Sequence, residues 1–130
     1  MIVADSSVWI DYFNGVATGQ AECLHTLLAE ELVLMGDIIL AEVLQGFRED
    51  NDFHKANRYL ATLDCARMLN RDLAIKSAQN YRRLRRKGVT IRRTIDVMIA
   101  TFCIERNLAL LHSDKDFEPM SKYLSLKSVM

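Results

Sequence analysis

The chain has 130 residues, which is the size of one domain, and its 17 acidic and 17 basic side chains balance, so the whole chain is not an obvious binder of polyanions. Half of its residues are hydrophobic, as in a globular protein, and no apolar run is long enough to span a bilayer. The three cysteines are widely spaced and form no zinc-ligand pattern, which predicts buried reduced thiols. The N-terminus has no basic segment, and Asp5 would interrupt a signal peptide, so we expect a cytoplasmic protein.

Short apolar segments alternate with amphipathic segments along the chain. The expected strands are residues 1–4, 32–35, 65–69, 108–111 and 124–129. The expected helices are residues 7–13, 20–30, a helix capped by Asp37, and residues 51–63, 71–87, 94–106 and 114–120. Because the strands are short and apolar on both faces, this pattern predicts an α/β domain with a mostly parallel sheet covered by helices on both sides.

Four carboxylates stand alone in apolar surroundings: Asp5, Glu42, Asp96 and Asp114. A buried carboxylate needs a hydrogen bond, a counter-charge or a metal ion, and four that converge would repel one another. A divalent cation is the simplest partner for such a cluster, and oxygen-only ligands favour magnesium or manganese.

The predicted elements can bring these four carboxylates to one crevice. Asp5 ends the first strand and Asp114 follows a later one, while Asp96 opens the helix before that later strand. Glu42 lies in the helix after the second strand. Ligands of parallel α/β folds bind outside the carboxyl ends of the strands, where the strand order switches, so we expect a site there.

Each carboxylate also has a structural interpretation. Asp5 and Asp114 can cap helices, and Asp96 can favour a helix N-terminus that Thr94 caps. Glu42 can be a solvated helix residue. Asp116 competes with Asp114 for the role of ligand. Ser7, which follows Asp5 closely, can orient a carboxylate or start a helix. The combination of four is more specific than any one of these residues.

Positive charge is concentrated in one segment of this neutral chain, at Arg82, Arg83, Arg85, Arg86, Lys87, Arg92 and Arg93. A basic face can hold phosphates, although cations are also favoured at a helix C-terminus. Because Arg92 and Arg93 come just before Asp96, a phosphate backbone held here would lie close to the metal. The predicted phosphate contacts are Arg82, Arg85, Arg86, Arg92 and Arg93.

Four segments together resemble the PIN-domain ribonucleases, and specifically the VapC toxins of toxin–antitoxin pairs. They are IVADSSVWI at residues 2–10, DIILAEVLQG at 37–46, TIDVMIA at 94–100 and LLHSDKDF at 110–117. The segments keep the order and spacing of the family's four motifs and span nearly the whole chain. His112 departs from the family, which often has Thr at this position before the last acidic residue.

The resemblance implies a single PIN domain over residues 1–130, a three-layer α/β/α sandwich that cleaves RNA with Mg²⁺ or Mn²⁺. Asp5 and Asp96 would be the principal metal ligands, Glu42 and Asp114 would complete the site, and Ser7 would support it. A metal-activated water would hydrolyse the phosphodiester and leave a 5′-phosphate. The resemblance also implies a homodimer and inhibition by a small VapB-like antitoxin, through which alone the protein would contact DNA.

Two alternatives have sequence features that count against them. A magnesium-binding receiver domain of a signalling system would carry a phosphorylatable Asp at the end of its third strand, where this chain has Asn70. A catalytically inactive binding module of the PIN fold would not need to retain all four acids. The sequence identifies neither the RNA target nor the antitoxin.

Overall fold

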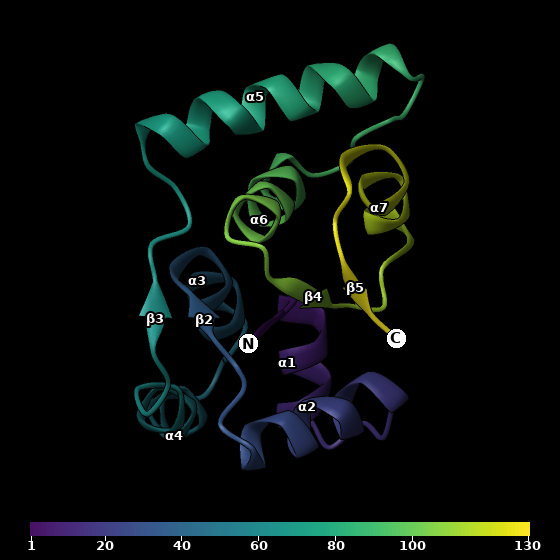
Figure 1. Ribbon diagram of the computed structural model, residues 1–130. Helices are drawn as coiled ribbons and strands as arrows, with labels where there is room; N and C mark the ends of the chain where they lie inside the picture. The colour runs from purple at the N-terminus through teal and green to yellow at the C-terminus, as the bar shows by residue number, and fades with distance from the viewer.

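A computed structural model describes residues 1–130 and contains five short strands, seven α-helices and one 3₁₀ helix (Figure 1). The strands are β1 (Ile2–Ala4), β2 (Met35–Gly36), β3 (Cys65–Ala66), β4 (Ala109–Leu111) and β5 (Ser128–Val129). The helices are α1 (Ser6–Phe13), α2 (Gly19–Ala29), α3 (Asp37–Gln45), α4 (Asp50–Leu60), α5 (Arg71–Arg86), α6 (Thr94–Glu105), the 3₁₀ helix η1 (Lys115–Phe117) and α7 (Glu118–Leu124). No helix is long and apolar enough to cross a membrane.

The strands are all parallel. Strand β4 lies between β1 and β5, and β2 pairs with β3. A single bridge between Ile2 and Val33 joins the two groups, through backbone hydrogen bonds from the amide of Ile2 to Leu32 and from Leu34 to Ile2. The spatial order is therefore β3-β2-β1-β4-β5. The chain builds outward from β1 in one direction, then returns to β1's other side with β4, so the switch point lies between β1 and β4.

Helices cover both faces of this sheet, which confirms the predicted α/β sandwich. Helix α1 packs against α2 and α3, and α3 packs against α4. On the other side, α6 packs against β4, and α5 lies across the outside of α6 and α7 (Figure 1). Both faces of the central strands β1 and β4 are therefore shielded, which explains why these two strands are apolar throughout, whereas the edge strands β3 and β5 each have an exposed residue.

The core is one connected cluster of 23 buried residues. Its largest members are aromatic, with Trp9, Phe102 and Phe117 completely buried. Each of these comes from a helix or turn that packs on the sheet, so burial of its large apolar surface anchors that element. Trp9 is thereby unavailable as a surface contact.

Several predicted details were wrong. The second and third strands are only two residues long, and the predicted helix at residues 114–120 is divided into η1 and α7. Cys65 is exposed, whereas Cys103 is buried as expected. Asp37 is the first residue of α3 and not its cap, and its carboxylate accepts hydrogen bonds from the amides of Ile38 and Met68, both at 2.9 Å. This contact ties the exit of β3 to the start of α3.

Gly36, the last residue of β2, is required by a close approach. A Cβ at this position would overlap the Met68 side chain, which is completely buried. The sheet edge and α3 can therefore pack together only because residue 36 has no side chain.

Candidate functional site

The switch point of the sheet holds the first and last of the predicted acids. Asp5 follows β1 directly, and Asp114 follows β4 by three positions. The amide of Asp5 donates a hydrogen bond of 2.9 Å to the carbonyl of Leu111, so the two strands remain joined at their carboxyl ends. The backbone therefore positions Asp5 beside the segment that carries Asp114.

The Asp5 side chain does not act as a helix cap, although Asp5 occupies the cap position of α1. Its Oδ2 accepts a hydrogen bond of 2.7 Å from the Ser7 hydroxyl. Its Oδ1 is buried and has no hydrogen-bond partner. The capping interpretation of this side chain is therefore wrong, and one buried oxygen is left without a ligand.

Asp96 is the most isolated carboxylate of the protein. It lies in the first turn of α6 and is 2% exposed, and neither of its carboxylate oxygens has a hydrogen-bond partner. Arg93, and not Thr94, occupies the cap position of α6, and no side chain caps this helix. A buried carboxylate with two unpartnered oxygens is costly unless a cation compensates it.

Glu42 also faces inward. Its side chain is 11% exposed, which contradicts the solvated interpretation, and its Oε1 has no partner. Its Oε2 contacts Nη2 of Arg93. Helix α3 thus brings a third carboxylate to the site, together with an arginine from the start of α6.

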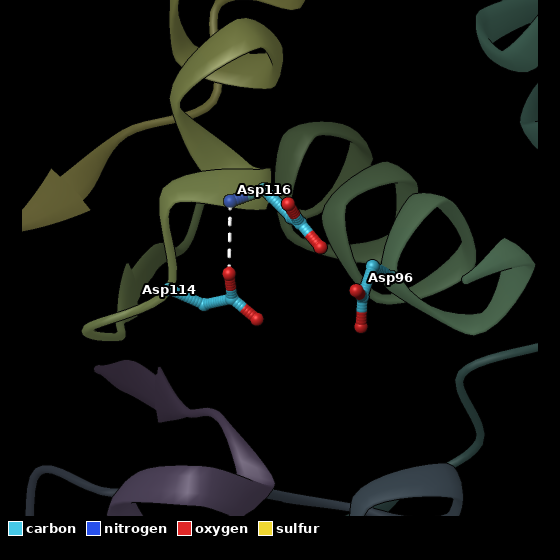
Figure 2. Close-up of side chains that lie close together, drawn as sticks. All are labelled: Asp96, Asp114 and Asp116. Atoms are coloured by element: carbon cyan, nitrogen blue, oxygen red, sulfur yellow. Dashed lines mark hydrogen bonds between the residues drawn. The ribbon is translucent and has the colours of Figure 1, made fainter. Parts of the chain in front are cut away.

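Asp114 and Asp116 both belong to the cluster, so the choice between them as predicted was too narrow. Oδ1 of Asp114 accepts a hydrogen bond of 2.9 Å from the amide of Asp116, so Asp114 does cap η1. Asp96, Asp114 and Asp116 nevertheless each offer an oxygen within 4.8 Å of the others. Figure 2 shows the second oxygen of Asp114 pointing into the space that it shares with Asp96.

The electrostatics show that the acids repel one another. The pKa of Asp96 is raised to about 6, mainly by burial; Arg93 lowers the pKa, and the carboxylates of Asp5, Asp114 and Glu42 raise it. Burial also raises the pKa of Glu42, where Asp5 adds to the effect and Arg93 opposes it. Mutual destabilisation of the ionised forms is typical of carboxylates arranged for a cation.

The five arginines predicted to contact RNA divide into two groups. Nη2 of Arg93 also lies 3.9 Å from Asp96, and Nη1 of Arg92 lies 3.9 Å from Asp116, so these two border the acids. Arg82, Arg85 and Arg86 are exposed on α5, in the outer helical layer. Sequence reasoning placed Arg93 near the metal but missed its direct contact with an acid.

The donor set fits a hard divalent cation. Asp96, Asp114 and Asp116 bring carboxylate oxygens within 4.8 Å of one another, while Asp5 and Glu42 lie outside this group of three but close enough to raise the pKa of Asp96. Four carboxylate oxygens, in Asp5, Glu42 and Asp96, are buried and have no hydrogen-bond partner. His112 lies next to this set, but its Nε2 is engaged with Ser128 at 3.0 Å and its ring packs on Phe117. Mg²⁺ and Mn²⁺ prefer oxygen ligands of this kind.

Comparisons with known proteins agree with this geometry. The family model described as "PIN domain" matches residues 2–123. Ribonuclease VapC11 of Mycobacterium tuberculosis and a VapC ribonuclease of Mycobacterium bovis are each 32% identical to this chain over 133 aligned positions. The alignments cover 98% of this chain and 97% of each relative.

Solved structures share the fold at lower sequence identity. VapBC2 of Rickettsia felis, bound to a promoter DNA fragment, matches with a TM-score of 0.78 and 18% identity over 99% of this chain and 98% of that chain. DNA-bound VapBC of Salmonella typhimurium matches with a TM-score of 0.76 and 16% identity over the same shares. Together with the family model and the two relatives, these matches lead to one conclusion: the chain belongs to the PIN-domain family, in its VapC group.

Proposed function

We propose that this protein is a metal-dependent endoribonuclease and the toxin of a VapBC-type toxin–antitoxin system. The observation that carries the proposal is Asp96, whose two oxygens are buried without a hydrogen-bond partner and one of which lies within 4.8 Å of an oxygen of Asp114 and of Asp116. The relatives that share the fold along the whole chain are named ribonucleases.

Each acid has a role that follows from its surroundings. Asp5 and Asp96 are the principal metal ligands, because they are the most deeply buried carboxylates of the cluster. Glu42, Asp114 and Asp116 complete the site from α3 and from the turn after β4. A bound Mg²⁺ or Mn²⁺ would activate water and neutralise charge on the phosphoryl group during hydrolysis.

Ser7 positions Asp5. Its hydroxyl donates to Oδ2, which leaves Oδ1 buried and without a hydrogen-bond partner. A carboxylate held by one hydrogen bond loses less rotamer freedom when it binds a cation, so its geometry is set in advance.

The basic segment supplies the phosphate contacts. Arg92 and Arg93 border the acids, and Arg82, Arg85 and Arg86 extend the positive charge along α5. RNA that lies along this segment would bring one phosphodiester to the cluster. The remaining phosphates would bind by charge alone, without sequence readout.

The partners follow from the structural neighbours. The VapBC proteins of R. felis and S. typhimurium are toxin–antitoxin complexes bound to DNA. We infer that this chain acts in the cytoplasm, forms a homodimer, and is inhibited by a VapB-like antitoxin that provides the contact with DNA.

The receiver-domain alternative does not fit the topology. In the flavodoxin-like order 2-1-3-4-5 of receiver domains, the third strand is central, whereas β3 here is an edge strand. Turnover of RNA by the purified protein distinguishes the nuclease from the inactive-module alternative.

Cleavage of RNA by the purified protein tests the proposal. The wild-type chain should cleave with Mg²⁺ or Mn²⁺ and stop with a chelator, while Asp5→Asn should reduce cleavage by at least a hundredfold. Asp64→Asn, which removes an exposed carboxylate, is the matched control and should cleave normally. A folded wild-type protein that binds metal but cleaves no RNA in a mixture of many cellular RNAs would instead support an inactive module.

A further inference from the structure

Arg93 makes the most direct cation contact of the acidic cluster. Its Nη2 contacts Oε2 of Glu42 and lies 3.9 Å from Oδ1 of Asp96. No other cation forms an ion pair with Glu42 or Asp96. Because Arg93 occupies the cap position of α6, its backbone holds it close to Asp96 whatever its side chain does.

The contact neutralises the cluster only in part. Arg93 reaches one oxygen of Glu42, while the other oxygen of Glu42 remains without a hydrogen-bond partner, as do both oxygens of Asp96. The cluster has five carboxylates, and only Arg92 and Arg93 border them. The metal-free site therefore retains an excess of negative charge that one arginine cannot remove.

The guanidinium is also free to leave. Its side chain is 46% exposed, while Glu42 is 11% exposed, so the arginine reaches the cluster from the solvent side. An arginine side chain has several rotatable bonds and stays charged at all relevant pH values. It can therefore move outward without burying an unpaired charge.

We propose that Arg93 is the counter-cation of the metal-free cluster, that a divalent metal ion displaces it from Glu42, and that the released guanidinium then binds the RNA phosphate beside the metal. This inference rests on the proposed function, because it assigns a new role to one residue of that site. The metal and Arg93 share Glu42 and Asp96 as partners, so each weakens the binding of the other.

The exchange predicts opposite effects on metal and RNA. Without Arg93, the metal no longer competes for Glu42 and should bind more tightly. RNA, in contrast, loses one phosphate contact and should bind more weakly. A residue with only a structural role would weaken both when it is removed, so the opposite signs distinguish the two roles.

Calorimetric titration of Mn²⁺ into the RNA-free protein tests the first part. Arg93→Gln should bind Mn²⁺ about tenfold more tightly than the wild type at about 0.15 M salt. Arg92→Gln is the matched control, because it removes the same charge from a neighbour that is 75% exposed and that pairs at 3.9 Å with Asp116. This control should tighten binding by no more than about threefold, since exposed charges are screened.

Two further measurements complete the test. At saturating Mn²⁺, Arg93→Gln should raise the KM for RNA several-fold. Arg93→Lys, which keeps the charge, should give a KM between those of Arg93→Gln and the wild type. In the wild type, NMR relaxation of the Arg93 guanidinium should show that this group becomes more mobile when Mg²⁺ is added. If the wild type binds the metal and cleaves RNA, but Arg93→Gln binds Mn²⁺ equally or more weakly, this inference alone is overturned. A wild type that binds no metal overturns the proposed function as well.

Discussion

Asp96 is a carboxylate that the metal-free fold holds in an unfavourable state. Its pKa is raised from 3.8 to about 6, whereas the unfolded chain ionises near the ordinary value. The folded protein thus binds this proton more tightly than the unfolded chain does. The metal-free protein should therefore lose stability as the pH rises from about 4 through 6, by roughly 2 to 3 kcal/mol at pH 7.

Asp96→Asn should remove this penalty. In chelator at pH 7, we expect the variant to melt a few degrees above the wild type, with the gain reduced because Asn is also a polar group without a partner. Thermal melts followed by circular dichroism from pH 4 to pH 8 measure the difference. The gap between the two proteins should close near pH 4, where Asp96 is protonated in the wild type. A variant that melts lower than the wild type at pH 7 would mean that Asp96 is a structural residue.

The acids of the site could be predicted because each interrupts an apolar run. Asp5, Glu42 and Asp96 are the only charges in segments that must be buried, so the sequence alone shows that each needs a partner. The contact between Arg93 and Glu42 could not be predicted. Seven basic residues follow one another closely, and no local pattern shows which of them turns inward.

At the scale of elements, the start of α3 depends on a glycine. Gly36→Ala should destabilise the protein by about 1 to 3 kcal/mol, because the new methyl group would overlap the buried Met68 side chain. Gly46→Ala is the matched control, since its Cβ would lie 3.5 Å from the carbonyl of Val43 in ordinary contact. The control should be neutral, or stabilising by up to about 1 kcal/mol. Urea denaturation compares the two, and equal stability of both variants would contradict the packing argument.

The basic end of α5 should act through charge. Replacing Arg85 and Arg86 with Ala should weaken RNA binding and reduce the salt slope of the binding constant by about 0.7 for each lost phosphate contact. Turnover at saturating RNA should change less. Binding titrations between about 50 and 200 mM salt provide the test. The control is Lys55→Ala combined with Arg58→Ala, which removes two exposed charges from α4 and should leave the salt slope unchanged. If the slope is also unaltered in the α5 variant, the basic end of α5 has another role.

Helices could be predicted more closely than strands. The expected helix at residues 71–87 corresponds to α5 (Arg71–Arg86), whose end Gly88 marks in the sequence; the structure adds that the Asn70 side chain caps its start. The expected strand at residues 65–69 is reduced to β3 (Cys65–Ala66). An apolar run shows that a segment is buried, but the sequence does not show where its hydrogen bonds to a neighbouring strand end.

At the scale of the whole molecule, the strand order brings β1, near the start of the chain, beside β4, which comes about a hundred residues later. Alternation of strands and helices predicted the sandwich, and the position of the acids predicted a site at one edge. The order β3-β2-β1-β4-β5 could not be predicted in the same way, because periodicity shows which faces are buried and not which strands are neighbours. The site exists only because β1 pairs with β4.

The pairing of β1 with β4 has a consequence for the cell that makes this protein. A ribosome that synthesises the chain is itself rich in RNA, yet Asp114 and Asp116 leave it long after Asp5. Until they emerge, the nascent chain carries Asp5 without its partners and cannot complete the domain. Ribosomes stalled before Asp114 and Asp116 have emerged should therefore carry chains that cleave no RNA, whereas chains released after these residues have been added should cleave it. Synthesis would then be safe for the ribosome without any antitoxin, which would be needed only once the chain is free.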